Sequence, residues 1–151
     1  AHTRMNGKII LLVEDNSSDE ELTLRALRKS NIGNEVVVAR DGAAALDYVF
    51  GRGAYDGRPV DDLPEVVLLD LNLPKIGGLE VLRAIRADER TKLLPVVILT
   101  SSSEDKDLVR GYGTGANSYI VKPVDFTQFV EAVKQLGMYW LVLNQRPRHR
   151  G

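Results

Sequence analysis

Four apolar, strand-like runs in this chain each end in side chains with reactive oxygen or nitrogen atoms. ILLVED ends in Glu14 and Asp15, VVLLD ends in Asp70, VVILT ends in Thr100, and SYIVK ends in Lys122. Paired carboxylates bind divalent cations, a carboxylate can act as a nucleophile, and an amine and a hydroxyl can hold phosphoryl oxygens. Together these side chains point to metal-assisted chemistry at phosphorus.

The runs that precede these side chains are rich in Val, Ile and Leu, which is typical of strands buried on both faces of a parallel sheet. The carboxyl ends of parallel strands share one edge, where open α/β sheets bind their ligands. We therefore expect the four strand ends to meet in one crevice. Each residue alone has an ordinary interpretation: a strand-ending acid, a helix cap or a solvated lysine. Their joint occurrence makes coincidence the weaker interpretation.

Mg²⁺ fits the expected acids, because it prefers oxygen ligands in octahedral geometry and keeps several waters. Another divalent cation such as Mn²⁺ is an alternative. We predict direct ligation by Asp15 and Asp70, with Glu14 binding directly or through water. The backbone carbonyl of Asn72, two residues after Asp70, is predicted to add a further oxygen ligand.

Asp70 facing a metal-bound phosphoryl group can act as a nucleophile and become an aspartyl phosphate. Lys122 is predicted to hold one phosphoryl oxygen, and Thr100 is predicted to donate its hydroxyl to another. No histidine is expected near the crevice, so no general base is evident and the phosphoryl group should persist. Pro123 allows a cis peptide bond after Lys122, but the sequence leaves the isomer open.

The elements that must position these residues alternate between strand and helix. The patterns predict strands over residues 8–14, 35–39, 66–70, 95–100 and 118–121. Helices are predicted after a Ser18 cap with Glu21, after Asp41, from about residue 79, over residues 103–116, and over residues 125–144 with Asp125 as the cap. Residues 51–64 read as an unusually long loop. The βα order predicts an α/β fold, a doubly wound five-stranded parallel sheet with helices on both faces.

The composition fits one domain of this kind. The chain has 151 residues, a formal net charge of -1 and no cysteine, which excludes disulfides and thiolate metal sites. Nothing in this charge attracts nucleic acid or membrane, and a cytoplasmic location is the default expectation. We expect a disordered tail or cloning remnant at residues 1–6, the domain at residues 7–145, and a basic flexible tail at residues 146–151.

The motifs closely resemble the receiver domain of two-component response regulators. The matching pieces are VEDN, LLDLNLP followed by GG, LTS and KP, and they cover nearly the whole chain. The resemblance implies a flavodoxin-like fold in which Asp70 accepts a phosphoryl group from a sensor histidine kinase. It also implies that Glu14 and Asp15 bind metal, that Thr100 is the switch hydroxyl, and that Lys122 is the essential amine. Tyr119 falls at the aromatic switch position, although a half-buried strand tyrosine is an equal interpretation.

The long loop and the ending YWLVLNQRP are similar to single-domain response regulators that are paired with bacterial and cyanobacterial phytochromes. This similarity implies a phytochrome kinase as the donor and a homodimer. Independently, the end of the last predicted helix is apolar nearly all round, which favours a dimer through this helix over a chain end that folds back. Residues Phe126, Phe129, Val130, Val133, Leu136, Trp140 and Leu143 form the predicted sheet-facing stripe.

An alternative function is a phosphohydrolase with an aspartyl nucleophile on a similar sheet. Such enzymes usually carry a second acid two residues after the nucleophile. Asn72 occupies that position here and cannot move a proton. A receiver-shaped binding module that needs no phosphorylation is a weaker alternative. The sequence therefore favours a phosphoacceptor signalling protein over an enzyme.

Overall fold

The helices and strands of the computed structural model alternate along the chain. The structure describes residues 9–29, 35–58, 62–101 and 115–137. The strands in these ranges are β1 (Ile9–Val13), β2 (Glu35–Ala39), β3 (Val66–Asp70), β4 (Val96–Thr100) and β5 (Ser118–Val121). The helices are α1 (Ser17–Lys29), α2 (Gly42–Phe50), the short 3₁₀ helix η1 (Gly53–Tyr55), α3 (Gly78–Ala87) and α5 (Phe126–Gln135).

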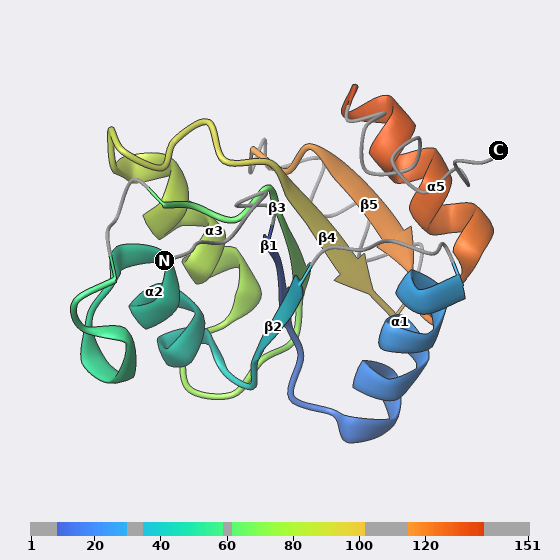
Figure 1. The fold of residues 1–151 in the computed structure, drawn as a ribbon, viewed down its shortest axis with the longest axis horizontal. Coiled ribbons are helices and arrows are strands. Elements are labelled where there is room, and N and C mark those ends of the chain that lie inside the picture. The colour runs from blue at the N-terminus through green and yellow to red at the C-terminus, as the bar shows by residue number, and fades with distance from the viewer. Residues whose placement is uncertain (1–8, 30–34, 59–61, 102–114, 138–151) are drawn as a thin grey trace, which may run out of the picture.

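The strands form one parallel sheet in the order β2-β1-β3-β4-β5, which places β3 at the centre (Figure 1). Parallel neighbouring strands need crossover connections, which usually place helices on the faces of the sheet. The order reverses direction between β1 and β3, so a crevice at the carboxyl edge is expected there. The predicted five-stranded doubly wound fold is confirmed.

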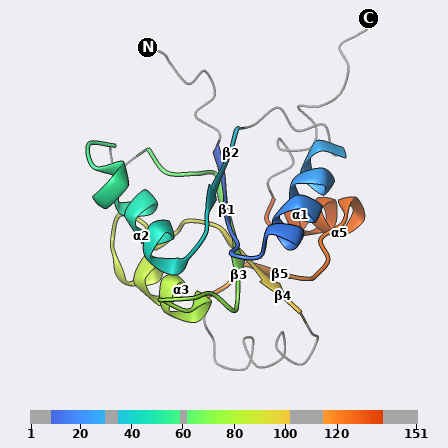
Figure 2. The ribbon, with the colours of Figure 1, turned by 90° about the horizontal axis from the view of Figure 1, so that it is seen from below.

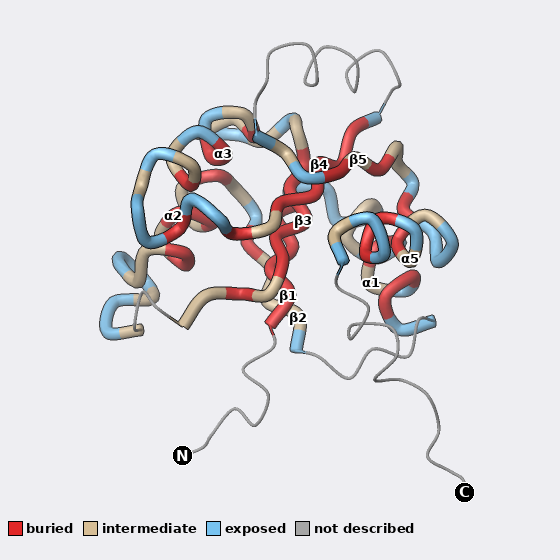
Figure 3. Tube along the Cα trace, turned by 90° about the horizontal axis from the view of Figure 1, so that it is seen from above, coloured by how far each residue is buried: buried red, intermediate tan, exposed pale blue. Residues whose placement is uncertain are grey.

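Helices cover both faces of the sheet, with α2 and α3 on one side and α1 and α5 on the other (Figure 2). The strand residues alternate between the two sides, because successive side chains of a strand point in opposite directions. In β1, for example, Leu11 and Val13 pack toward α2 and α3, whereas Ile10 and Leu12 pack toward α1 and α5. The three central strands β1, β3 and β4 are therefore buried on both faces (Figure 3), and their ends are held rigidly.

The helix starts follow from side-chain caps. The carboxylate of Asp41 accepts from the backbone N–H of Ala44, and that of Asp125 accepts from Gln128, as predicted for the last helix. The prediction for the first helix is wrong by two residues. The helix begins at Ser17, and the side chain of Asn16 rather than Ser18 accepts from the backbone N–H of Asp19, at 2.8 Å.

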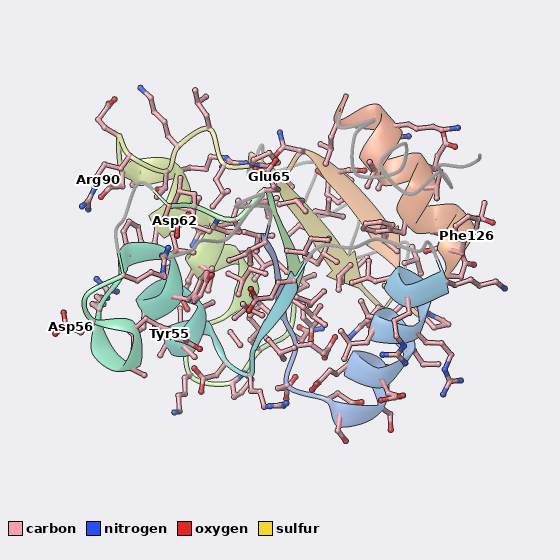
Figure 4. All side chains as sticks on the ribbon, viewed as in Figure 1. Tyr55, Asp56, Asp62, Glu65, Arg90 and Phe126 are labelled. Atoms are coloured by element: carbon pink, nitrogen blue, oxygen red, sulfur yellow. The ribbon has the colours of Figure 1, made fainter. Side chains whose placement is uncertain are left out.

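The last helix is shorter than predicted. It ends at Gln135, and Gly137 adopts a left-handed backbone with φ of 74° that a helix cannot continue through. The prediction that Phe126 faces the sheet is also wrong. Phe126 is 39% exposed at the start of α5 (Figure 4), and the sheet-facing positions are Phe129, Ala132 and Val133.

Several predictions lie outside the described residues. These are the tails at residues 1–6 and 146–151, most of the helix predicted over residues 103–116, and the apolar end beyond Gly137. The long connection after α2 contains η1 and is tied to α2 by Arg58, which donates to the carbonyls of Tyr48 and Val49. Within the described ranges, no helix combines the length and apolar character that crossing a membrane requires.

Candidate functional site

The predicted acids meet at the carboxyl edge of the sheet. One carboxylate oxygen from each of Glu14, Asp15 and Asp70 lies within 4.8 Å of the other two. Glu14 and Asp15 directly follow β1, and Asp70 ends the neighbouring strand β3. Glu14 is fully buried and Asp70 is 3% exposed, whereas Asp15 is exposed to solvent. The parallel pairing of β1 with β3 thus brings together acids that are more than fifty residues apart.

Lys122 reaches into the same cluster from the loop after β5. Its ammonium nitrogen lies 3.2 Å from Glu14 Oε1, 3.3 Å from Asp70 Oδ1 and 3.0 Å from Asp19 Oδ2. Its side chain is 12% exposed, and the peptide bond between Lys122 and Pro123 is cis. The lysine is therefore a partly buried cation shared among carboxylates, and its contact with a phosphoryl oxygen stays a prediction.

The charges of the cluster shift the pKa values in a consistent way. Burial, together with the charge of Asp70, raises the pKa of Glu14 to about 7. Burial alone would lower the pKa of Lys122, but its hydrogen bond to Asp19 and the charges of Asp70 and Glu14 outweigh burial and raise it. The lysine therefore stays charged, whereas Glu14 holds its proton to a higher pH than an exposed glutamate does.

Thr100 lies next to this cluster at the end of β4. The strand pairs with β3, with Asp70 opposite Leu99, and with β5, with Thr100 opposite Val121. The backbone N–H of Lys122 donates to the carbonyl of Thr100 at 2.7 Å. Thr100 is fully buried and lies one strand away from Asp70.

The remaining predicted residues occupy the edge of the cluster. The backbone N–H of Asn72 donates to Asp70 Oδ1 at 3.3 Å, which keeps this loop residue beside the acids. Metal binding by the backbone carbonyl of Asn72 stays a prediction. Tyr119 lies on β5, partly buried against the core on the α2 and α3 side, a position compatible with both interpretations of this residue.

Gly78 allows α3 to start directly beside the carboxyl end of β3. The backbone oxygens of Asp70 and Leu71 stand where a Cβ atom at residue 78 would lie. The backbone N–H of Gly78 donates to the carbonyl of Leu71 at 3.1 Å. The second glycine of the predicted GG motif is therefore required by close backbone packing under the site.

Asp19 is a site residue that the sequence reasoning missed. Its carboxylate accepts from the Lys122 ammonium, a contact that the sequence pattern did not predict. The two residues are 103 positions apart, so local spacing gives no signal of the contact. Its place in the first turn of a helix that follows the acid pair is the feature that could have drawn attention to it.

The donor set fits a hard divalent cation. Carboxylate oxygens that converge within one coordination sphere are the ligands that Mg²⁺ and Mn²⁺ prefer. The raised pKa of Glu14 indicates that the buried acids repel one another and would gain from such a charge. Glu14, Asp15 and Asp70 are the residues that would hold it.

Comparison with known proteins identifies the family. The model of the response regulator receiver domain matches residues 10–134, which is most of the chain. The chain belongs to this family. The receiver fold, with an aspartate at the end of the central strand, agrees with the geometry described above.

Three similar proteins define the neighbourhood of this receiver. The bacteriophytochrome response regulator AtBRR has a solved structure that is 55% identical, with a TM-score of 0.84, covering 88% of this chain and 94% of that one. The Mn²⁺-bound form of response regulator Rcp1, a Synechocystis protein, is 37% identical with a TM-score of 0.70, covering 89% and 94%. The probable methanogenesis regulatory protein FilR2 of Methanothrix harundinacea is 44% identical over 140 residues, 92% of this chain and 87% of that protein.

Proposed function

We propose that this receiver is a signalling protein that accepts a phosphoryl group on Asp70. The observation that carries the proposal is the shared position of Asp70: it lies within 4.8 Å of two further acids and 3.3 Å from the Lys122 ammonium. An Asp70 oxygen would bond to phosphorus while the bond from phosphorus to the donor histidine nitrogen breaks, leaving the electron pair on that nitrogen. A divalent cation bound by the acids would supply charge neutralisation to the transferring group.

The other site residues would hold and report the phosphoryl group. Lys122 would donate to one of its oxygens, and the Thr100 hydroxyl would donate to another. Phosphorylation would then favour the conformation in which Thr100 is drawn toward Asp70, a population shift between two states. Tyr119 is proposed as a switch residue because it lies on the strand that pairs with β4.

Labelling with acetyl phosphate and Mg²⁺ tests the acceptor. The wild-type chain should take up one stable phosphoryl group, which intact-mass spectrometry detects, and Asp70→Asn should lose the label completely. Asp88→Asn, at the far end of α3, is the matched control and should label like the wild type. Labelling of the Asp70→Asn variant would contradict the assignment. Sustained turnover of phosphomonoesters would support the phosphohydrolase alternative.

A sensor histidine kinase is the proposed donor, with a bacterial phytochrome kinase as the first candidate. The similarity to the bacteriophytochrome response regulator AtBRR supports this choice, whereas the similarity to FilR2, a probable methanogenesis regulatory protein, supports a test against other kinases as well. Phosphotransfer from a panel of purified histidine kinases, including a phytochrome kinase, would identify the donor by its rate. The cytoplasmic location expected from the sequence stays a prediction.

A homodimer through the C-terminal segment is also proposed. Residues 138–143 read MYWLVL, six consecutive apolar side chains that directly follow the described part of the chain. Truncation after Gly137 should convert the protein from dimer to monomer in sedimentation velocity experiments. A full-length monomer, or a truncated protein that still forms dimers, would contradict this assignment.

A further inference from the structure

A closed circuit of hydrogen bonds joins the first turn of α1 to the loop after β5. The backbone N–H of Asn16 donates to Glu14 Oε2 at 3.2 Å, and the backbone N–H of Asp19 donates to Asn16 Oδ1 at 2.8 Å. Lys122 closes the circuit by donating to Asp19 Oδ2 at 3.0 Å and to Glu14 Oε1 at 3.2 Å. The helix cap thus fixes the backbone of Asp19 in a position from which its side chain holds the lysine.

The ammonium of Lys122 is already surrounded by three carboxylates. Of its three N–H donors, one donates to Asp19 at 3.0 Å and one to Glu14 at 3.2 Å, and Asp70 Oδ1 forms an ion pair with the same nitrogen at 3.3 Å. A phosphoryl group on Asp70 would bring further charged oxygens that compete for the same donors. One of the existing partners must therefore give up its share of the ammonium.

Asp19 is the partner that can be released at the lowest cost. Its side chain is 32% exposed, whereas the side chains of Glu14 and Asp70 are 0% and 4% exposed. Water can replace the ammonium at Asp19, whereas it has no access to the fully buried Glu14 carboxylate. The position of Asp19 in the first turn of α1 also favours a free carboxylate, because the helix N-terminus carries partial positive charge.

We propose that Asp19 is a positioning residue that holds the Lys122 ammonium in the unphosphorylated protein and releases it to the phosphoryl group formed on Asp70. This inference rests on the proposed function of Asp70 as the acceptor. Asp19 then competes with the phosphoryl group for Lys122, so it slows labelling and destabilises the labelled state. Its release also breaks the circuit, so the first turn of α1 senses the modification.

The pairing itself can be tested without any phosphoryl group. The side-chain ¹⁵N resonance of the Lys122 ammonium, assigned by its loss in Lys122→Met, should be protected from hydrogen exchange in the wild type. Asp19→Asn and Asp19→Ala should shift this resonance and weaken its protection. Glu20→Gln removes the same charge from the neighbouring residue, which pairs with Arg40, and should leave the resonance unchanged. An unaltered resonance in both Asp19 variants overturns the inference.

The release step is tested by the second-order rate of labelling with acetyl phosphate at saturating Mg²⁺. Asp19→Asn and Asp19→Ala should label roughly two- to fivefold faster than the wild type, the range of a partly exposed ion pair. Asp19→Glu retains the charge and should restore a rate near that of the wild type, as should Glu20→Gln. Equal rates in all variants, or equal acceleration by Glu20→Gln, overturn the proposal while leaving Asp70 as the acceptor. Absence of label in the wild type instead overturns the proposed function and the release step together.

Discussion

Lys122 and Arg86 are two partly buried cations in different parts of the fold, and their surroundings differ in kind. Lys122 contacts the carboxylates of Glu14, Asp19 and Asp70. Arg86, on α3, donates to the carbonyls of Leu94 and Gly115 and to Asn117 Oδ1, at 2.7, 3.0 and 2.8 Å.

The pKa shifts of the two cations run in opposite directions for this reason. Burial lowers the pKa of Arg86, whose hydrogen-bond acceptors described here are neutral oxygens. At Lys122 the hydrogen bond to Asp19 and the neighbouring carboxylates overcome burial and raise the pKa. Arg86 therefore satisfies fixed backbone groups and contributes to stability, whereas Lys122 partly offsets the excess negative charge of the acid cluster. Separate measurements of stability and metal response distinguish the two roles.

The largest stability effect is expected at Arg86. Arg86→Ala leaves the carbonyls of Leu94 and Gly115 without this donor and should lower the free energy of unfolding by about 2 kcal/mol or more. Urea denaturation followed by circular dichroism measures the change. Arg83→Ala, at an exposed position of the same helix, should change stability by less than about 0.5 kcal/mol. Stabilisation of Arg86→Ala by Mg²⁺ that clearly exceeds the stabilisation of the wild type would show that the contrast between the two regions is wrong.

A smaller effect of opposite sign is expected at Asp70. Asp70→Asn removes one of the repelling acids and should raise the free energy of unfolding by about 1 kcal/mol in EDTA. Mg²⁺ should stabilise the wild type more than this variant, because a ligand is lost. The exposed Asp56→Asn is the control and should behave like the wild type in both buffers. Destabilisation of Asp70→Asn in EDTA would argue that these acids are structural.

The pH dependence of stability should show the strain at Glu14. Its pKa is raised in the folded state from 4.5 to about 7, so the folded protein binds the proton more tightly than the unfolded chain does. Its contribution to stability is thus greatest below pH 4.5 and is lost as the pH rises through about 7. In EDTA, Glu14→Gln should remove this part of the pH dependence, measured as the melting temperature between these pH values. Identical profiles for the variant and the wild type would contradict the shift.

The strands could be predicted from the sequence because their signal is local. VVLLD, EVVVA and SYIV are bounded by turn residues, and the predicted limits of these strands agree with the structure. The acids at the strand ends could also be placed, since parallel strands share an edge whatever the details of the helices. The caps by Asp41 and Asp125 were predictable because each lies three residues from the backbone N–H that it accepts from.

The failures have two causes: local signals that the sequence does not resolve, and contacts between residues far apart in the chain. Asn16 and Ser18 are both good cap residues, and the sequence does not say which one the tight turn after Glu14 favours. Apolar spacing continued through Gly137, but the left-handed backbone there ends α5. Asp19 contacts Lys122, which lies 103 positions away, and Arg86 contacts Gly115 and Asn117, which lie 29 and 31 positions away. Local patterns carry no information about such contacts.

The order of the strands has a consequence for local opening of the fold. The three central strands are buried at every residue, whereas β2 and β5 alternate or are half exposed. Amide hydrogens of β1, β3 and β4 should therefore exchange with solvent deuterium last, and those of the outer strands earlier. Asp70 is carried by the most protected strand, while Tyr119 is carried by an outer one. The proposed modification of Asp70 on β3 would then be transmitted to the outer strand β5, which can open locally while the rest of the protein stays folded.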